Sequence, residues 1–296
     1  MAELKLFRLN GNVEELKSQS VTIEKELQNT IEKNMQEFFA VRFLASEYRI
    51  DNGRMDSIGI DENNCPVIFE YKRFSSENVI NQGLFYLNWQ WEHKANFKLL
   101  VLETYGKEVA DNIDWTMPRV ICIASDFNKY DEEAIKQINR YVSLIRYKQY
   151  STDLLLFELL NTNTVAPIEN EPTEHKKQQN NEKTFTEQYK NAPQKFKDLY
   201  DELSYYALSL GDDVSQSTLK LYSAFKKIKN FCTMEVYQAK MLLNFRLNPD
   251  DYQLSDTLRD VRNIGHWGCG DLQLIMRDRS EIDTAKMLIL KAYENN

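Results

Sequence analysis

The sequence has few of the residues that build thiolate metal centres or disulfide frameworks. Its 296 residues include three histidines and four cysteines, and no Cys-x-x-Cys spacing occurs among Cys65, Cys122, Cys232 and Cys269. Such a spacing is the usual sequence sign of a zinc site. We therefore expect neither a zinc site nor a disulfide framework.

Long apolar runs and a basic excess are also missing. No run approaches the roughly 18 apolar residues that a membrane helix needs, and the N-terminus lacks the apolar segment of a secretion signal. The expectation is a cytoplasmic protein without membrane contact. The formal net charge of −8 argues against a basic coat that binds nucleic acid regardless of sequence, so any nucleic-acid contact is expected to be local.

Residues 1–160 are expected to form a mixed β-sheet flanked by helices. Ile23, Leu27, Ile31 and Met35 are four positions apart, which predicts an amphipathic helix over 21–39. Further helical patterns lie at 76–94 and 130–141, and apolar runs typical of strands lie within 53–73 and at 97–105, 118–127, 142–150 and 153–160. A turn is expected at Asn10 and Gly11. This mixture favours the α/β class.

The composition changes after residue 160. Residues 161–190 are polar with few large apolar side chains, which predicts a linker. Residues 191–296 show helical patterns at both ends and alternating strand patterns within 218–247. We therefore expect a second, smaller α+β accessory domain at 191–296.

Two apolar runs of the first domain carry unexpected charges. They flank a polar stretch that predicts the turn of a β-hairpin, and if the turn centres near Asn63, Asp56 lies directly across from Glu70. Lys72 shares the face of Glu70, because side chains alternate along a strand. Opposed residues lie about 5 Å apart, and like charges at that distance destabilise the pair. A hard divalent cation such as Mg²⁺ would relieve the repulsion, so the pair predicts a metal site.

The ordinary alternative is a solvated Glu-Lys pair on an exposed sheet face. Glu-x-Lys occurs three more times in the sequence, always outside the predicted strands. Val67, Ile68 and Phe69 directly precede Glu70, however, and predict a strand covered on both faces. An exposed charged face fits such a strand badly.

An Asp followed by Glu-x-Lys on the next strand of a hairpin, with a helix on either side, resembles the PD-(D/E)XK nuclease superfamily. That family has the restriction-endonuclease-like fold. Met55 stands where the family name has Pro, a departure that the family tolerates. Gln82 and Tyr86, one helical turn apart, are similar to the Gln-x-x-x-Tyr motif of the RecB-like and archaeal endonuclease branches. The alternative for Gln82 and Tyr86 is ordinary packing of an aromatic residue beside a surface glutamine. The resemblance to the family covers residues 20–160.

The resemblance implies a nuclease that depends on Mg²⁺ or Mn²⁺. Asp56, Glu70 and the backbone carbonyl of Tyr71 would hold the ion, which would bind a scissile phosphate and lower the pKa of a water. Lys72 would orient that water or stabilise charge on the phosphate. Gln82 and Tyr86 would position the lysine, the nucleophile or the phosphate.

Family members often add an acidic residue from the first helix. Glu24 is the first candidate and Glu32 the second, with solvated helix charges as the alternative for both. Arg54, Arg73 and Lys94 flank the hairpin and are candidates for contacts with backbone phosphates. The alternative for each of these three is a solvated surface charge.

The C-terminal part has one unusual segment, residues 263–271, with the sequence NIGHWGCGD. Three glycines within six residues predict a tight turn whose backbone is open to a ligand. His266 and Cys269 admit nucleophilic chemistry, but no third partner is evident, so a histidine held in a turn is the favoured interpretation. Trp267 is interpreted as a core residue rather than a platform for a base.

Within residues 220–231, lysines alternate with aromatic residues, a pattern compatible with a pair of strands that faces nucleic acid. The residues are Lys220, Tyr222, Phe225, Lys226, Lys227, Lys229 and Phe231. A solvated face over packed aromatics is the favoured alternative. As a unit, residues 190–296 resemble an uncharacterised domain often found behind nuclease-like domains, a comparison that supplies no activity.

The leading hypothesis is a Mg²⁺-dependent nuclease acting on DNA, with a C-terminal domain that recognises the substrate or a protein partner. A homodimer is compatible with it, since nucleases that cut both strands often dimerise. The alternative from another class is a non-catalytic nucleic-acid-binding or regulatory module on the same fold. A third hypothesis places the activity around His266.

Overall fold

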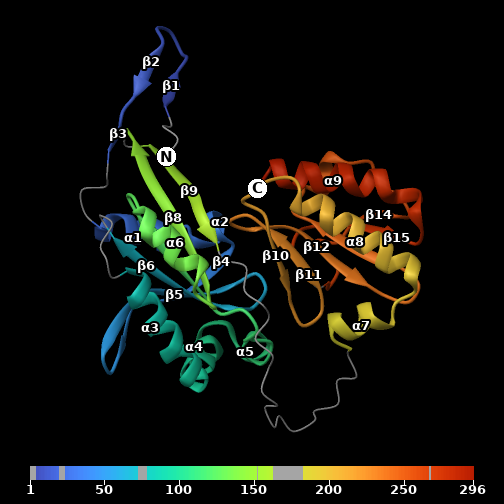
Figure 1. Cartoon of the computed structure of the whole chain (residues 1–296), viewed down its shortest axis with the longest axis horizontal. Helices are drawn as coiled ribbons and strands as arrows, with labels where there is room; N and C mark the ends of the chain where they lie inside the picture. The colour runs from blue at the N-terminus through green and yellow to red at the C-terminus, as the bar shows by residue number, and fades with distance from the viewer. Residues whose placement is uncertain (1–4, 20–23, 73–78, 152, 163–182, 267) are drawn as a thin grey trace. The chain divides into compact units, whose positions relative to one another are not determined.

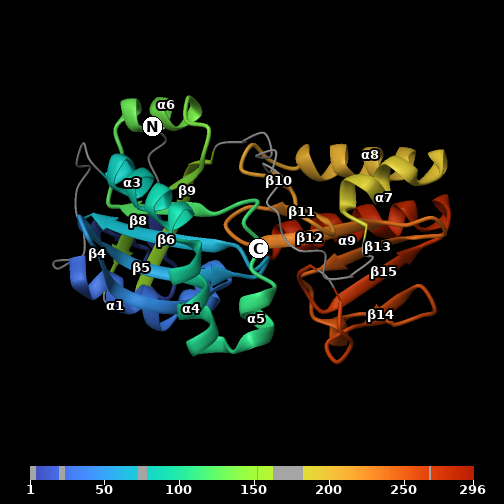
Figure 2. The same ribbon diagram turned by 90° about the horizontal axis from the view of Figure 1, so that it is seen from below.

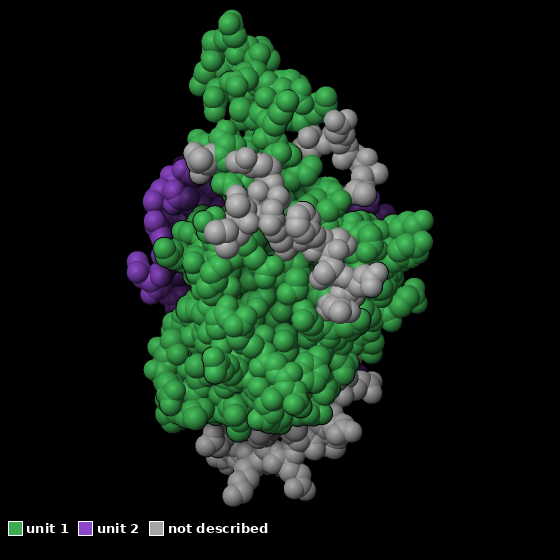
Figure 3. Space-filling model, turned by 90° about the vertical axis from the view of Figure 1, so that its left-hand side faces the viewer, with its two compact units in different colours: residues 1–60, 66–111, 118–165 green, residues 61–65, 112–117, 166–296 purple. Residues whose placement is uncertain are grey.

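The computed structural model describes residues 5–19, 24–72, 79–151, 153–162, 183–266 and 268–296 (Figure 1). The chain divides into two compact units, coloured separately in Figure 3. The N-terminal unit contains residues 1–60, 66–111 and 118–165, and the C-terminal unit contains residues 61–65, 112–117 and 166–296. No helix in the described ranges is both long and apolar enough to cross a membrane.

A mixed sheet of seven strands forms the centre of the N-terminal unit. In the described residues the order is β4-β5-β6-β7-β8-β9, with β3 paired to the end of β8. β6, β7 and β8 run parallel, whereas β5 with β6 and β8 with β9 are antiparallel. The strands are β3 (Ser18–Gln19), β4 (Val41–Ile50), β5 (Gly53–Asp61), β6 (Pro66–Lys72), β7 (Arg119–Ala124), β8 (Tyr141–Tyr150) and β9 (Leu154–Thr162).

Helices cover both faces of this sheet, with α3 on one side and α1 on the other (Figure 2). A Cβ added to Gly83 of α3 would meet Val120 Cγ1 at 2.6 Å, so the helix lies close against β7. β6 and β7 are buried on both faces, as their continuous apolar sequences predict. The helices are α1 (Glu24–Lys33), α2 (Met35–Phe39), α3 (Val79–Glu92), α4 (Lys94–Tyr105), α5 (Lys107–Asp111) and α6 (Lys129–Lys136). The predicted α/β class with a mixed, helix-flanked sheet is confirmed.

The prediction of a buried strand at 97–105 is wrong, because this segment lies in α4. A short apolar run carries no period that separates a strand from a helix. Phe97 and Val101, one turn apart, are buried, while Leu99 and Leu102 are exposed, which is the helical period. Because the exposed Leu99 and Leu102 are also apolar, the sequence of this helix has the continuous apolar run that is typical of a buried strand.

Two further details of this unit differ from the sequence-based expectation. The helix expected over 21–39 is interrupted at Asn34, which separates α1 from α2. Strand β4 was not predicted, because Arg42, Glu47 and Arg49 interrupt its apolar pattern. Charges are tolerated there because β4 is an edge strand of the sheet.

A hairpin that was not predicted precedes the sheet. β1 (Leu6–Arg8) pairs antiparallel with β2 (Glu14–Leu16). The turn expected at Asn10 and Gly11 lies between these strands, and Gly11 has a φ of +87°, a conformation that glycine adopts readily. We call residues 5–16 the N-terminal arm.

The C-terminal unit is a second sheet with helices. Its six described strands are all antiparallel in the order β10-β11-β12-β13-β15-β14. Alternate residues of this sheet form one apolar core with the helices. The elements are α7 (Phe185–Asn191), α8 (Gln194–Leu208), β10 (Ser215–Thr218), β11 (Ser223–Lys226), β12 (Asn230–Val236), β13 (Met241–Phe245), η1 (Pro249–Asp251), β14 (Leu258–Asp260), β15 (Leu272–Met276), η2 (Arg279–Glu281) and α9 (Ile282–Glu294).

The predicted linker at 161–190 contains a helix at its end. Thr184 and Glu187 form a capping box, in which each side chain accepts from the backbone N–H of the other. Phe185 is buried in the core of the C-terminal unit. The prediction of linker up to residue 190 is therefore wrong for α7, and residues 163–182 lie outside the described ranges.

The loop between β5 and β6 belongs to the C-terminal unit. Asn63 Oδ1 accepts from Tyr222 Oη at 3.0 Å and from Asn230 Nδ2 at 2.7 Å. Glu62 accepts from the Asn230 N–H at 2.8 Å and pairs with Arg246. The predicted boundary at residue 160 assigns residues 61–65 to the first domain, whereas the structure places them in the C-terminal unit.

Candidate active site

The β5–β6 hairpin brings Asp56 and Glu70 together. Its register pairs Ser57 with Phe69, so the next residues outward are Asp56 and Glu70. The Asp56 N–H donates to Glu70 Oε1 at 3.3 Å, and the Tyr71 N–H donates to Asp56 Oδ2 at 3.0 Å. The predicted hairpin is thus confirmed, and each carboxylate accepts a hydrogen bond from the backbone of the opposite strand.

Both carboxylates are in an environment that disfavours their charge. Glu70 is 2% exposed, and burial together with the charge of Asp56 raises its pKa to about 9. The pKa of Asp56 is also raised, mainly by burial. No Lys or Arg side chain of the described residues forms an ion pair with either carboxylate.

Lys72 lies at the end of β6, two residues beyond Glu70 and paired in register with Ala124 of β7. It is partly exposed, and its positive charge lowers the pKa of both Asp56 and Glu70. The ammonium group is therefore within electrostatic reach of the pair.

The two candidate acids of α1 have different environments. Glu32 Oε1 accepts from Ser57 Oγ at 2.6 Å, and Ser57 Oγ in turn accepts from Tyr71 Oη at 3.1 Å. These hydrogen bonds lie on the face of the sheet opposite Glu70, because Tyr71 follows Glu70 directly on β6 and neighbouring residues of a strand point to opposite faces. The charge of Glu24, by contrast, contributes to raising the pKa of Asp56.

Gln28, which sequence reasoning missed, joins α1 to the site. Its Nε2 donates to the backbone oxygen of Asp56 at 2.8 Å and to Glu32 Oε1 at 2.8 Å. A polar residue next to Leu27 on the buried face of a helix was the available signal. Gln28 therefore ties α1 to the backbone of β5 at Asp56.

Helix α3 places Tyr86 beside the start of β5. The Arg54 N–H donates to Tyr86 Oη at 3.3 Å, and a Cβ added to Gly53 would meet the Tyr86 ring at 2.8 Å. Gln82, one turn earlier, has a buried Oε1 with no hydrogen-bond partner in the described part of the chain. Both residues of the predicted motif thus lie on the side of α3 that faces the sheet, and one carries an unused acceptor.

The predicted phosphate-binding residues are mostly engaged elsewhere. Arg54 forms an ion pair with Glu47, which also binds Lys25 at 2.9 Å. The Lys94 ammonium lies 3.5 Å from the centre of the Trp91 ring, and burial lowers its pKa. Arg73 lies outside the described residues.

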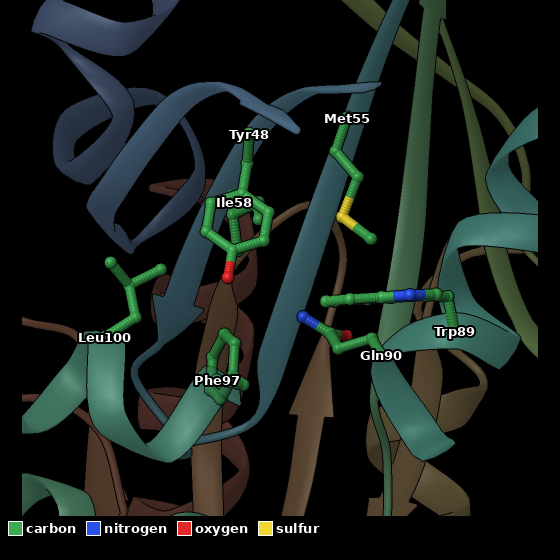
Figure 4. Close-up of a pocket in the computed structure, with 7 residues that line it drawn as sticks. All are labelled: Tyr48, Met55, Ile58, Trp89, Gln90, Phe97 and Leu100. Atoms are coloured by element: carbon green, nitrogen blue, oxygen red, sulfur yellow. The ribbon is translucent and has the colours of Figure 1, made fainter. Parts of the chain in front are cut away.

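A small cavity lies between β5 and the helices α3 and α4 (Figure 4). Its walls are almost entirely apolar and include Tyr48, Met55, Trp89 and Phe97. Gln90 is 1% exposed and points its amide toward this cavity, and neither amide atom has a hydrogen-bond partner among the described residues. Nothing in the pattern of residues around Gln90 predicts this buried amide.

The oxygen atoms at Asp56 and Glu70 suit a hard cation. Each carboxylate accepts a backbone hydrogen bond and lies close to a like charge, and burial disfavours the charged form of both. No set of three His, Cys, Asp or Glu side chains in the described ranges is arranged to hold an ion. The pair would therefore need backbone or water oxygens to complete a coordination shell.

The glycine-rich segment of the C-terminal unit is held by its histidine. His266 Nδ1 lies 2.9 Å from the Ile264 oxygen, and Nε2 lies 2.9 Å from the Gly270 oxygen. Cys269 is buried, and burial raises the pKa of its thiol. The interpretation of His266 as a residue held in a turn is confirmed, and Trp267 lies outside the described residues.

The lysine and aromatic pattern does not form an open basic face. Lys226 is buried, and Lys227 pairs with Asp213 at 3.7 Å and lies over the Tyr293 ring. Phe225 and Phe231 belong to the core. The favoured alternative, charges outside a packed aromatic face, describes this region.

Comparison with known proteins finds a family match for the C-terminal part of the chain. Residues 185–296 match a family described as "Domain of unknown function (DUF5655)". An "Uncharacterized protein" of Haemophilus influenzae is 28% identical over 294 residues, covering 96% of this chain and 97% of that protein. The sequence match to this bacterial relative therefore spans both units of the chain.

Two solved structures share a partial likeness. A repair endonuclease from Pyrococcus abyssi is 17% identical, covers 44% of this chain and 49% of its own, and has a TM-score of 0.30. An EndoMS–dsDNA complex is 14% identical, covers 48% of this chain and 64% of its own, also with a TM-score of 0.30. A likeness of this strength carries no argument about activity.

Proposed function

We propose that this protein is a metal-dependent nuclease that hydrolyses phosphodiester bonds in DNA. The observation that carries the proposal is the contact of Asp56 with the buried Glu70, two carboxylates without an ion-pair partner among the described residues, with Lys72 near enough to lower the pKa of both. Burying carboxylates in this way is unfavourable unless a cation or protons compensate them. A cation also gives the site a chemical use.

Asp56, Glu70 and the backbone carbonyl of Tyr71 would hold Mg²⁺ or Mn²⁺. When bound, such an ion polarises a phosphate and lowers the pKa of a water at neutral pH. Glu24, whose charge contributes to the raised pKa of Asp56, would accept hydrogen bonds from the waters around the site. Gln28 and the Tyr71 N–H keep Asp56 in place.

Lys72 would donate to the oxygen of the scissile phosphate on which negative charge develops. Removing one preorganised donor of this kind lowers kcat by about 10²–10³ in well-studied enzymes. The unused Oε1 of Gln82 would accept from the Lys72 ammonium or from the attacking water. Tyr86 would act through its contact with the Arg54 N–H at the start of β5.

A second candidate function is a non-catalytic module that binds nucleic acid or regulates a partner. The absence of a third acidic or histidine ligand beside Asp56 and Glu70 in the described ranges favours it. In either case the C-terminal unit would recognise the substrate or a protein partner. The two candidates differ in whether Lys72 is needed for turnover or only for binding.

The test uses the purified full chain with Mn²⁺ or Mg²⁺ and single-stranded, double-stranded and flapped DNA, with RNA as a fourth substrate. Asp56→Asn and Glu70→Gln are expected to lower cleavage at least about 100-fold and to weaken metal binding in calorimetry. Glu235→Gln, which changes a buried glutamate of the C-terminal unit, is the matched control. Cleavage of no substrate, with metal binding unchanged by Asp56→Asn, would overturn the proposal.

A further inference from the structure

The turn of the β5–β6 hairpin, residues 61–65, belongs to the C-terminal unit, whereas the rest of both strands belongs to the N-terminal unit. The hairpin is also the element that carries Asp56 and Glu70. The two carboxylates of the candidate active site therefore share a hairpin with residues that the C-terminal unit holds.

The apolar pattern of the two strands does not select their register. Residues 57–61 of β5 and residues 66–71 of β6 are all buried, on both faces of the sheet. A slip of one strand by one residue exchanges one buried face for the other, and it takes Glu70 away from Asp56. In a hairpin of this kind, the geometry of the turn is left to fix the register.

The turn has a defined shape of its own. Asp61 is 1% exposed, and its Oδ1 accepts from the N–H groups of Asn63 and Cys65, both at 2.9 Å. The Asp61 N–H donates to the Cys65 oxygen at 2.9 Å, and Asn64 has a φ of +59°. The backbone of the turn is therefore fixed from within by one buried carboxylate.

Two side chains of the turn are held by residues far away in the sequence. Asn63 Oδ1 accepts from Tyr222 Oη at 3.0 Å and from Asn230 Nδ2 at 2.7 Å. Glu62 accepts from the Asn230 N–H at 2.8 Å and pairs with Arg246. The Arg246 Nε in turn donates to the Asn230 oxygen at 2.8 Å, which closes the set. Since Asn63, Tyr222 and Asn230 are all buried, breaking these bonds would leave buried polar groups unsatisfied.

The hairpin connects this turn directly to the candidate active site. Four residue pairs in regular register separate the turn from Asp56 and Glu70. At ~3.4 Å per residue, the five steps from Asp61 to Asp56 span about 17 Å. A change in the register of the turn therefore reaches the carboxylates through a short, continuous ladder.

The two hydrogen bonds at the carboxylates report the register. The Asp56 N–H donates to Glu70 Oε1 at 3.3 Å, and the Tyr71 N–H donates to Asp56 Oδ2 at 3.0 Å. Each of these bonds runs from one strand to the other. A slip of either strand breaks both of them.

We propose that Glu62 and Asn63 are positioning residues of the candidate active site, through which the C-terminal unit sets the register of Asp56 and Glu70. This role rests on the proposed nuclease function, because it concerns the same two carboxylates. The C-terminal unit acts on the site in this way without supplying a ligand to it.

The first test is amide hydrogen exchange of the full chain without metal. Tyr222→Phe and Arg246→Met each remove a side-chain bond to the turn, and both changes lie outside the hairpin. The N–H groups of Asp56 and Tyr71 are expected to exchange about fivefold faster in each variant, the effect of losing one hydrogen bond. The N–H groups of β8, two strands away from β6, are expected to exchange at the wild-type rate.

Asn248→Ala is the matched control. It removes a side-chain acceptor from another turn of the C-terminal unit, where Asn248 accepts from the Asp250 N–H at 3.2 Å. Both reporting N–H groups are expected to exchange as in wild type. Unchanged exchange in both Tyr222→Phe and Arg246→Met, or an equal acceleration throughout β8, would overturn the proposal.

The second test measures Mn²⁺ binding by calorimetry. The double variant Glu62→Ala/Asn63→Ala loses the bonds to Tyr222, Asn230 and Arg246, and is expected to bind Mn²⁺ at least about tenfold more weakly. Glu62→Gln keeps an acceptor for the Asn230 N–H and is expected to bind within about twofold of wild type.

The two tests separate this role from the nuclease function. Unchanged Mn²⁺ affinity in the double variant, with DNA cleavage intact, overturns the positioning role and leaves the nuclease function standing. Faster exchange at Asp56 and Tyr71 in a protein that cuts no DNA supports the positioning role and counts against the nuclease function.

Discussion

The N–H of Asp56 donates to Glu70 Oε1 at 3.3 Å, and the N–H of the residue after Glu70 returns a bond to Asp56 Oδ2 at 3.0 Å. Backbone N–H groups of the hairpin therefore hold the two carboxylates in position. Placement of this kind holds both groups close together even though their charges repel. The protein must compensate that repulsion with a proton or a cation.

Without metal, Glu70→Gln is expected to stabilise the protein at pH 8 and to leave its stability at pH 4 unchanged. The pKa of Glu70 is about 9 in the folded protein and near the usual 4.5 when unfolded. Stability from the protonated carboxyl is complete below pH 4.5 and is lost as pH rises through 9. The neutral amide avoids this loss, so a gain of at least about 1.4 kcal/mol, equivalent to one pKa unit, is expected.

The measurement is unfolding by urea in the presence of a chelator at both pH values. Glu103→Gln on the exposed surface of α4 is the control and should change little at either pH. Equal stability of wild type and Glu70→Gln at pH 8 would mean that Glu70 ionises normally.

Metal binding is expected to release a proton. Near pH 7 the raised pKa of Glu70 keeps its carboxyl protonated, and an ion that takes this oxygen displaces the proton. Titration calorimetry with Mn²⁺ in buffers of different ionisation enthalpy should give close to one proton per ion. The affinity should rise up to about tenfold per pH unit and level off above pH 9. Binding of full strength with no proton released would contradict this linkage.

The sequence predicts the central strands of the sheet and the β5–β6 hairpin more completely than the edge of the sheet. The hairpin register follows from a count about Asn63, because β5 and β6 have a short polar turn and side chains that alternate strictly. β6 and β7 are buried on both faces, and their apolar runs show it. At 97–105 the same kind of run is a helix, and at β4 an edge strand with charges has no clear pattern.

The site was predictable as far as it depends on one strand or one helix. Asp56 and Glu70 belong to one hairpin, so local geometry places them. The environments of Glu24 and Glu32 depend on how α1 lies across the sheet, and the bond from Ser57 to Glu32 is a contact between residues 25 positions apart. Long-range contacts of this kind leave no trace in the spacing of residues.

Lys72→Met is expected to separate catalysis from metal binding. Cleavage should fall by about 10²–10³, because the donor to the phosphate is lost. Metal binding should persist, since the Lys72 ammonium forms no ion pair with Asp56 or Glu70 and is not a ligand. Lys98→Met removes an exposed lysine that pairs with Asp111 on the surface and should leave cleavage unchanged. Unchanged cleavage by Lys72→Met would favour the non-catalytic module.

His266→Ala is expected to loosen the glycine-rich segment without affecting cleavage. Both ring nitrogens lie within hydrogen-bond distance of backbone oxygens, so the ring closes the loop between residues 264 and 270. Cys269 is buried in this loop and should become reactive toward a thiol reagent when the ring is removed. The labelling rate of the variant against wild type is the measurement. Loss of cleavage with Cys269 still protected would instead support an activity around His266.

Gln90→Met and Gln28→Met are expected to change stability in opposite directions. Both glutamines are buried, at 1% and 4% exposure. Gln28 donates to the Asp56 oxygen and to Glu32, so its replacement leaves buried acceptors unsatisfied and should cost about 1–3 kcal/mol.

Gln90 makes no hydrogen bond with the described residues and faces an apolar cavity, so methionine removes two unsatisfied polar atoms and should stabilise by a similar amount. Thermal unfolding of the two variants beside wild type checks both signs. Destabilisation by Gln90→Met of the same size as by Gln28→Met would show that the Gln90 amide is bonded in solution, because the two substitutions are chemically identical.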